Sequence, residues 1–163
     1  MHIKLINKKL HFEEYRVKCS IGKRGISTKK VEGDEKTPRG TYRFLSVFYR
    51  KDRTPKIKTS LKKIVIKKNM VWCDDPKSKK YNKLTLLPFE FSAEKLFLKK
   101  NIYDIIIVLN YNIKPTKKNK GSAIFLHIAE KKYKPTKGCV AIAKKDILLL
   151  LKNINFRSKI SIY

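Results

Sequence analysis

Two neighbouring segments decide the fold: Gly121–Ala129, with the sequence GSAIFLHIA, and Pro135–Ile142, with the sequence PTKGCVAI. Each contains a short run of β-branched and other apolar residues, which is typical of a buried strand. His127 ends the first predicted strand, and Cys139 follows a glycine at the start of the second. Because a loop of only about ten residues joins them, we expect the strands to be neighbours in one sheet, with both side chains at one edge.

A thiol beside an imidazole is an arrangement used for nucleophilic catalysis. The imidazole accepts the thiol proton and stabilises the thiolate, which is the nucleophile. Gly138 lets the backbone approach a substrate and leaves amide N–H groups to face a developing oxyanion. In a plainer interpretation, Cys139 is a small buried hydrophobe and His127 is a hydrogen-bonded surface residue. A zinc site of Cys73, His127 and Cys139 is disfavoured, since no ligand spacing supports it.

The charge of the chain has two explanations. Among 163 residues there are 41 basic and 13 acidic side chains, which gives a formal net charge of +28, and 34 of the basic residues are lysines. AT-rich codon usage is the preferred explanation, and a surface for nucleic acid, wall polymer or anionic membrane is the alternative. The lysines are spread along the whole chain without an RNA-binding aromatic motif, so specific nucleic-acid binding is not expected.

The lysine excess also has a local consequence near the predicted thiol. Positive charges beside a thiol are expected to lower its pKa and to attract carboxylate-bearing ligands. The loop before Cys139 holds four such residues: Lys131, Lys132, Lys134 and Lys137.

Composition excludes several classes of protein. A hydrophobic content of 42% predicts a folded globule rather than a disordered basic tail. The longest apolar run, Ile105–Leu109, has five residues, far short of the roughly 18 that span a bilayer. Three cysteines without a Cys-x-x-Cys spacing indicate neither a disulfide framework nor a zinc knuckle. Residues 1–9 are too charged for the apolar core of a signal peptide.

The pattern along the chain predicts a mainly β domain with a few short helices, of sandwich or barrel type. Helices are expected at Ser92–Leu98, which begins with a capping residue, and at Asp146–Lys152, where an aspartate favours the helix start. No linker or repeat interrupts the chain, so a single domain over residues 1–163 is expected. Strands are predicted at His2–Ile6, Arg16–Gly22, Thr41–Tyr49, Lys63–Ile66, Ile102–Leu109, Ala123–Ile128, Cys139–Ala143 and Lys159–Tyr163.

These segments resemble the L,D-transpeptidase catalytic domain of the YkuD type. The signature of that family is a His at a strand end, a variable loop, and then Ser/Thr-His-Gly-Cys followed by an apolar residue. The residues that match it are His127, Thr136, Gly138, Cys139 and Val140. The segment Gly33–Tyr42 (GDEKTPRGTY) resembles a second family motif, and Val71–Pro76 (VWCDDP) is similar to a stretch in one bacterial subgroup.

The resemblance implies a fold, a chemistry and a substrate class. Cys139 would attack a donor stem peptide of peptidoglycan, with His127 as general base, the Ile128 carbonyl orienting the imidazole, and amides near Gly138 forming the oxyanion hole. The thioester would pass to an amine, making a 3→3 cross-link, or to water, making the enzyme an L,D-carboxypeptidase. No metal or cofactor is implied, and carbapenems are expected to acylate the thiol.

The chain departs from the family pattern beside the thiol. Lys137 replaces the second histidine of the signature, and Ala141 replaces the Asn or Arg that follows the cysteine by two residues. Donor recognition is therefore expected to differ, and hydrolysis is an open outcome. We expect the following residues to contact substrate: Thr136, Lys137, Trp72, Asp74 and Tyr111.

Two further readings stay open at the level of sequence. One is a basic polyanion-binding module that has lost its activity. The other is a cytoplasmic thiol enzyme that recycles wall peptides, because no signal peptide is visible, although family analogy favours the periplasm or cell envelope. Oligomeric state is not indicated by any pattern in the chain.

Overall fold

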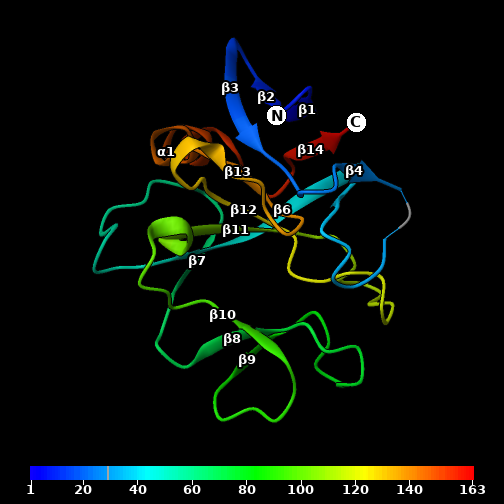
Figure 1. The fold of residues 1–163 in the computed structure, drawn as a ribbon. Helices are drawn as coiled ribbons and strands as arrows, with labels where there is room; N and C mark the ends of the chain where they lie inside the picture. Colours follow the sequence, from blue (N-terminus) through cyan, green and yellow to red (C-terminus); the bar gives the residue numbers. More distant parts are fainter. Residues whose placement is uncertain (29) are drawn as a thin grey trace.

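The computed structural model describes residues 1–28 and 30–163, and its centre is a closed eight-stranded β-barrel (Figure 1). A ninth strand, β7 (Lys62–Val65), extends the sheet from one barrel strand. The eight barrel strands, in their order around the sheet, are β11 (Ile105–Leu109), β12 (Phe125–Ile128), β13 (Val140–Ile142), β3 (Tyr15–Ser20), β2 (Lys9–Phe12), β1 (His2–Ile6), β14 (Lys159–Ile162) and β6 (Gly40–Tyr49).

Strand β6 closes the barrel. Its first residues pair with β14, and its second half pairs with β11 on one side and β7 on the other. The strand has ten residues, many of them aromatic or β-branched, and is long enough to contact three partners. Phe44 and Val47 both lie inside, whereas Arg43 and Leu45 are exposed, because a shift in the register with β11 between positions 44 and 46 interrupts the alternation.

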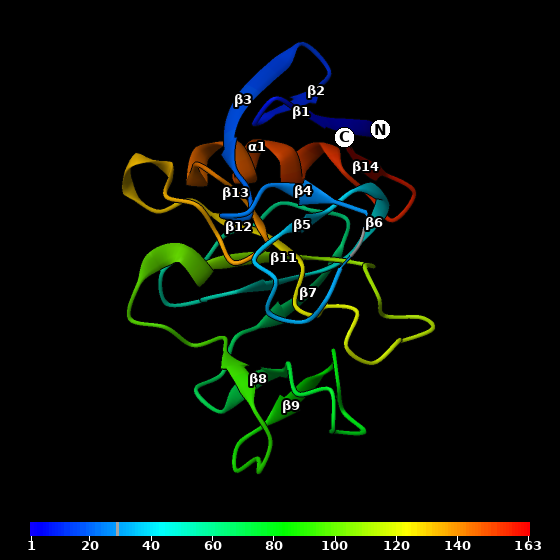
Figure 2. The ribbon, with the colours of Figure 1, turned by 45° about the vertical axis from the view of Figure 1, so that its right-hand side comes forward.

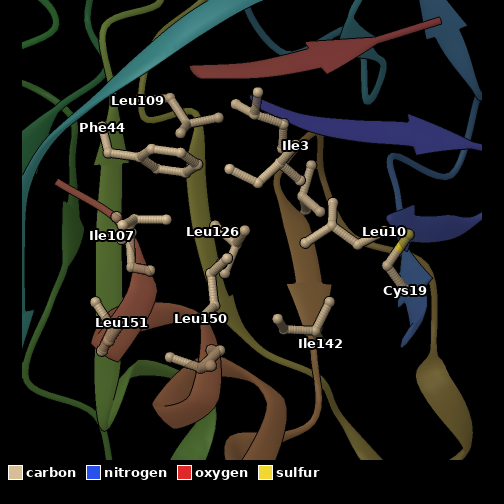
Figure 3. Packing of buried hydrophobic residues seen from close by; sticks show 14 of the residues in the cluster. Ile3, Leu10, Cys19, Phe44, Ile107, Leu109, Leu126, Ile142, Leu150 and Leu151 are labelled. Atoms are coloured by element: carbon tan, nitrogen blue, oxygen red, sulfur yellow. The ribbon is translucent and has the colours of Figure 1, made fainter. Parts of the chain in front are cut away.

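The barrel core consists mainly of aliphatic side chains, and one helix, α1 (Lys144–Asn153), packs its buried side chains against it. Leu150 and Leu151 of α1 point toward Ile107 and Leu126 of the barrel (Figure 3). Asp146 lies in the first turn of α1, where a negative charge suits the helix dipole. Within the residues that the structure describes, no helix is long and apolar enough to cross a membrane.

A small second sheet lies at the end of the barrel opposite β1–β3 (Figures 1 and 2). It contains β8 (Met70–Cys73) between β9 (Leu84–Leu86) and β10 (Ala93–Lys95). Trp72 of β8 joins it to the barrel, because its indole packs edge-on against the rings of Phe48 and Phe125. A minor pair, β4 (Ile26–Ser27) with β5 (Thr37–Pro38), and two single 3₁₀ turns, Asn101–Tyr103 and Lys131–Tyr133, complete the elements.

Most predicted elements are present, and the mainly β barrel is confirmed. The helix predicted at Ser92–Leu98 is wrong, since this segment supplies β10, which pairs with β8. A capping residue is a weak local signal, and cross-strand pairing that buries Leu96 outweighs it. The strand predicted from Ile102 begins at Ile105, after the 3₁₀ turn, and the helix predicted at Asp146–Lys152 is slightly longer than expected.

Candidate active site

Strands β12 and β13 bring the predicted thiol and imidazole to the same face of the sheet. The two strands are parallel neighbours, with His127 opposite Ala141 and Leu126 opposite Val140. Cys139 lies two residues before Ala141, so alternation puts its side chain on the face that also holds His127. Both side chains line one cleft of about 720 Å³, which runs between the barrel and the small sheet.

The thiol of Cys139 is neutral, and two hydrogen bonds to the backbone fix its position. It is 8% exposed, donates to the carbonyl of Ala123 (3.1 Å) and accepts the N–H of Phe125 (3.4 Å). Its pKa is raised to about 12, chiefly by burial and then by the charge of Glu94, against a lowering by the Phe125 N–H and by the charge of Lys30. A preformed thiolate is therefore not the resting state of this site.

The four loop lysines do not have the predicted effect on the thiol. We expected Lys131, Lys132, Lys134 and Lys137 to lower the pKa of Cys139, but burial dominates and the pKa rises. These side chains extend from an exposed loop, where water screens their charge.

The alkylation of Cys139 by iodoacetamide reports this raised pKa. Because only the thiolate reacts, we expect the rate to increase about tenfold per pH unit between about pH 7 and 10, without a plateau. Mass spectrometry of the Cys139 peptide separates its reaction from that of Cys19 and Cys73. A plateau already reached below pH 7 would instead indicate a thiolate–imidazolium pair.

His127 is a buried neutral imidazole with a defined tautomer. Its Nδ1 lies 2.9 Å from the carbonyl oxygen of Ile128, and a carbonyl only accepts, so Nδ1 carries the proton and Nε2 is unprotonated. Burial lowers the pKa of His127 to about 4, although the Ile128 carbonyl and the charge of Glu130 act in the other direction. The ring of Tyr103 packs edge-on at 5.2 Å and fixes the plane of the imidazole.

A network of threonines anchors the loop before Cys139. The Thr136 hydroxyl donates to the Cys139 carbonyl (2.6 Å) and accepts the Gly138 N–H (3.1 Å). The buried Thr37 hydroxyl donates to the Gly138 carbonyl (2.9 Å) and accepts the Gly22 N–H (2.8 Å). The Gly138 N–H is therefore already bonded to Thr136 and does not point freely at a substrate, as its predicted role as an oxyanion donor would require.

Glycine is required at position 138 for two reasons. Its φ of +135° is a conformation that side chains rarely adopt, and a Cβ there would lie 2.9 Å from the Lys36 carbonyl oxygen. Gly138 therefore allows the segment just before β5 to pack directly against the loop that presents Cys139.

Two residues predicted to contact substrate are not part of the cleft. Trp72 is buried under the small sheet and donates its indole N–H to Asn82 (2.9 Å), so it supports the wall without lining the cleft. Tyr111 packs against Tyr42 and donates its hydroxyl to the Lys120 carbonyl. Burying these large rings against other rings removes more apolar surface from water than a cleft position would.

The remaining predicted contacts, Thr136, Lys137 and Asp74, do line the cleft, and sequence reasoning missed several other lining residues, of which three matter here. These are Glu94, Tyr103 and Ser122. Glu94 lies in the segment Ser92–Leu98, for which a helix was predicted, and no sequence motif marks Ser122 as a functional residue. Among residues 1–28 and 30–163, no cluster of three or more His, Cys, Asp or Glu side chains is suited to a metal ion, and all three cysteines are free thiols.

The fold and the site together define a closed β-barrel domain that carries a thiol and an imidazole on one wall of a cleft. The family model for the YkuD L,D-transpeptidase catalytic domain matches residues 4–162, and the chain belongs to that family. No curated protein sequence matches the chain significantly. Among solved structures, Bd1075 of Bdellovibrio bacteriovorus is similar at 19% identity and a TM-score of 0.48; the match covers 99% of this chain and 46% of that one.

Proposed function

We propose that the protein is a cysteine acyltransferase of peptidoglycan stem peptides, with Cys139 as nucleophile and His127 as general base. The observation that supports this most is the shared cleft of these two side chains, with Nε2 of His127 as the unprotonated nitrogen. The family assignment supplies the class of reaction, and the departures at Lys137 and Ala141 concern the recognition of the donor.

The proposed reaction has two steps. Cys139 Sγ leaves the Ala123 carbonyl, gives its proton to His127 Nε2 and attacks the donor carbonyl between meso-diaminopimelate and D-Ala. The C–N bond breaks, His127 returns the proton to the departing amine, and a thioester with Cys139 forms. In the second step an amine or water attacks the thioester, His127 accepts its proton and passes it to the released thiol.

The amide N–H groups of Lys137 and Cys139 are the proposed oxyanion donors, since that of Gly138 is bonded to Thr136. Both outcomes of the second step use the same site, so a 3→3 cross-linking enzyme and an L,D-carboxypeptidase differ only in whether an amine reaches the thioester before water. Because the proposed substrate lies in the cell envelope, the envelope is also the proposed place of action.

Acylation by a carbapenem tests the proposed nucleophile. We expect the protein incubated with meropenem to gain the mass of one carbapenem, and tandem mass spectrometry to place it on Cys139. The Cys139→Ala variant should gain none, because the remaining thiols, Cys19 and Cys73, are buried outside the cleft.

Cys73→Ala is the matched control, since it removes a buried thiol outside the cleft and should leave the adduct intact. Absence of an adduct on a folded protein whose Cys139 reacts with iodoacetamide would refute the proposed function. In the same experiment with a stem tetrapeptide, release of D-Ala with or without an added D-amino acid separates transfer from hydrolysis.

A further inference from the structure

The wall of the cleft that faces the thiol has two carboxylates on one face of the small sheet. Glu94 of β10 lies directly opposite Trp72 of β8, and Asp74 follows Trp72 by two residues. Alternation therefore puts Asp74 and Glu94 on the face that Trp72 packs onto the barrel, and both line the cleft. Glu94 lies in β10 and Asp74 directly follows β8, so the pairing of these two strands sets the spacing of the carboxylates.

Among the residues that the structure describes, two oxygen atoms lining this cleft have no hydrogen-bond partner. Asp74 Oδ1 is buried and unpaired, and so is the hydroxyl of Ser122, a residue that is 8% exposed. A buried polar atom without a partner is costly and is rare in folded proteins. Both residues line the cleft, so a ligand with hydrogen-bond donors would satisfy both atoms.

The surroundings of Glu94 in the cleft disfavour its ionised form. Burial raises the pKa of Glu94, and the charges of Asp74 and Glu32 raise it further, while the Tyr103 hydroxyl, which donates to Glu94 Oε1 (2.5 Å), and the Lys137 charge lower it. Two carboxylates that repel each other in a half-buried site are stabilised by any positive group placed between them.

We propose that Asp74, Glu94 and Ser122 form a subsite for a primary ammonium group of the peptide substrate. An ammonium group has three N–H donors, and the subsite offers three acceptors: Asp74 Oδ1, the Glu94 carboxylate and the Ser122 hydroxyl oxygen. The substrate class is then a peptide with a free amine close to the reacting carbonyl. This inference rests on the proposed function, because it assigns the recognition of that substrate.

Occupation of the subsite would also activate the thiol. The charge of Glu94 disfavours a thiolate at Cys139, and a bound ammonium group offsets that charge. A substrate with the correct amine would therefore make Cys139 a better nucleophile as it binds, whereas a peptide without the amine would not.

Binding to the Cys139→Ala variant tests the subsite without catalysis. The probe is L-Ala-D-Glu-meso-diaminopimelate-D-Ala, with its side-chain amine either free or acetylated, and calorimetry measures affinity. We expect acetylation to weaken binding about tenfold or more, and the added changes Asp74→Asn and Glu94→Gln to abolish the difference. Glu90→Gln, the same charge change at an exposed site outside the cleft, should preserve it. Equal binding of both peptides would overturn a donor subsite.

A second experiment, with D-lysine as the acceptor amine, shows whether the ammonium group belongs to the donor or to the acceptor. If acetylation of the donor has no effect, but Asp74→Asn and Glu94→Gln lower the fraction of thioester captured by D-lysine rather than water, the ammonium group belongs to the acceptor. If neither arm shows an effect, the subsite is refuted. Carbapenem acylation of Cys139 is measured in parallel, so the loss of the subsite is distinguished from failure of the proposed function.

A second readout separates recognition from structural damage. Glu94→Gln removes the charge that disfavours the thiolate, so we expect iodoacetamide, which has no amine, to alkylate Cys139 faster than in the wild type. The same variant should be acylated more slowly by the peptide with a free amine. A general distortion of the cleft would shift both rates in the same direction, and that result would contradict the subsite.

Discussion

Replacing His127 with glutamine should lower the rate at which Cys139 is acylated by about 10²–10⁴-fold, which is the usual contribution of a general base. Glutamine keeps a donor for the Ile128 carbonyl but offers no basic nitrogen in place of Nε2. Because the pKa of Cys139 is raised to about 12, the thiol depends on this base at neutral pH. The rate of the carbapenem adduct, followed by intact mass, measures the effect.

His11→Gln is the matched control, since His11 belongs to β2 and does not line the cleft. Its acylation rate should equal that of the wild type. Thermal unfolding of both variants shows whether the barrel is intact. An unchanged acylation rate in a folded His127→Gln protein would remove His127 from the proposed mechanism and leave Cys139 without its base.

Replacing Thr37 with valine should destabilise the protein by about 2–4 kcal/mol. Thr37 is fully buried, and valine preserves its shape but leaves the Gly22 N–H and the Gly138 carbonyl unpaired. Each buried group without a partner costs about 1–3 kcal/mol. The midpoint of urea unfolding, with the slope checked for constancy, measures the loss of free energy of unfolding.

The same change should slow acylation of Cys139, because Gly138 loses the bond that positions the loop before the thiol. Thr85→Val is the control: Thr85 lies in β9, does not line the cleft, and suits a β-branched residue. A Thr37→Val protein as stable as the wild type would show that the two glycine groups find other partners, contrary to the arrangement described above.

Much of the barrel follows from local pattern. Continuous apolar runs such as Ile105–Leu109 form strands that are buried on both faces. The alternating sequence of Lys159–Ile162 forms a strand that pairs with β1. The pairing of β12 with β13 was also predictable, since a short loop between two buried strands restricts where the second can lie. Strands with weaker patterns, such as β9 and β10, depend on their partners and were missed.

The sequence by itself determined the barrel class, the family resemblance and the neighbouring places of His127 and Cys139, because these depend on apolar periodicity and on residues close together in the chain. Only the tertiary structure decided the protonation of the thiol and the composition of the opposite wall. Burial raises the pKa of Cys139 despite the lysines next to it in sequence. Asp74, Glu94 and Ser122 are far apart in the sequence and line the same cleft. Their proximity depends on how the small sheet packs against the barrel, which cannot be predicted from local sequence.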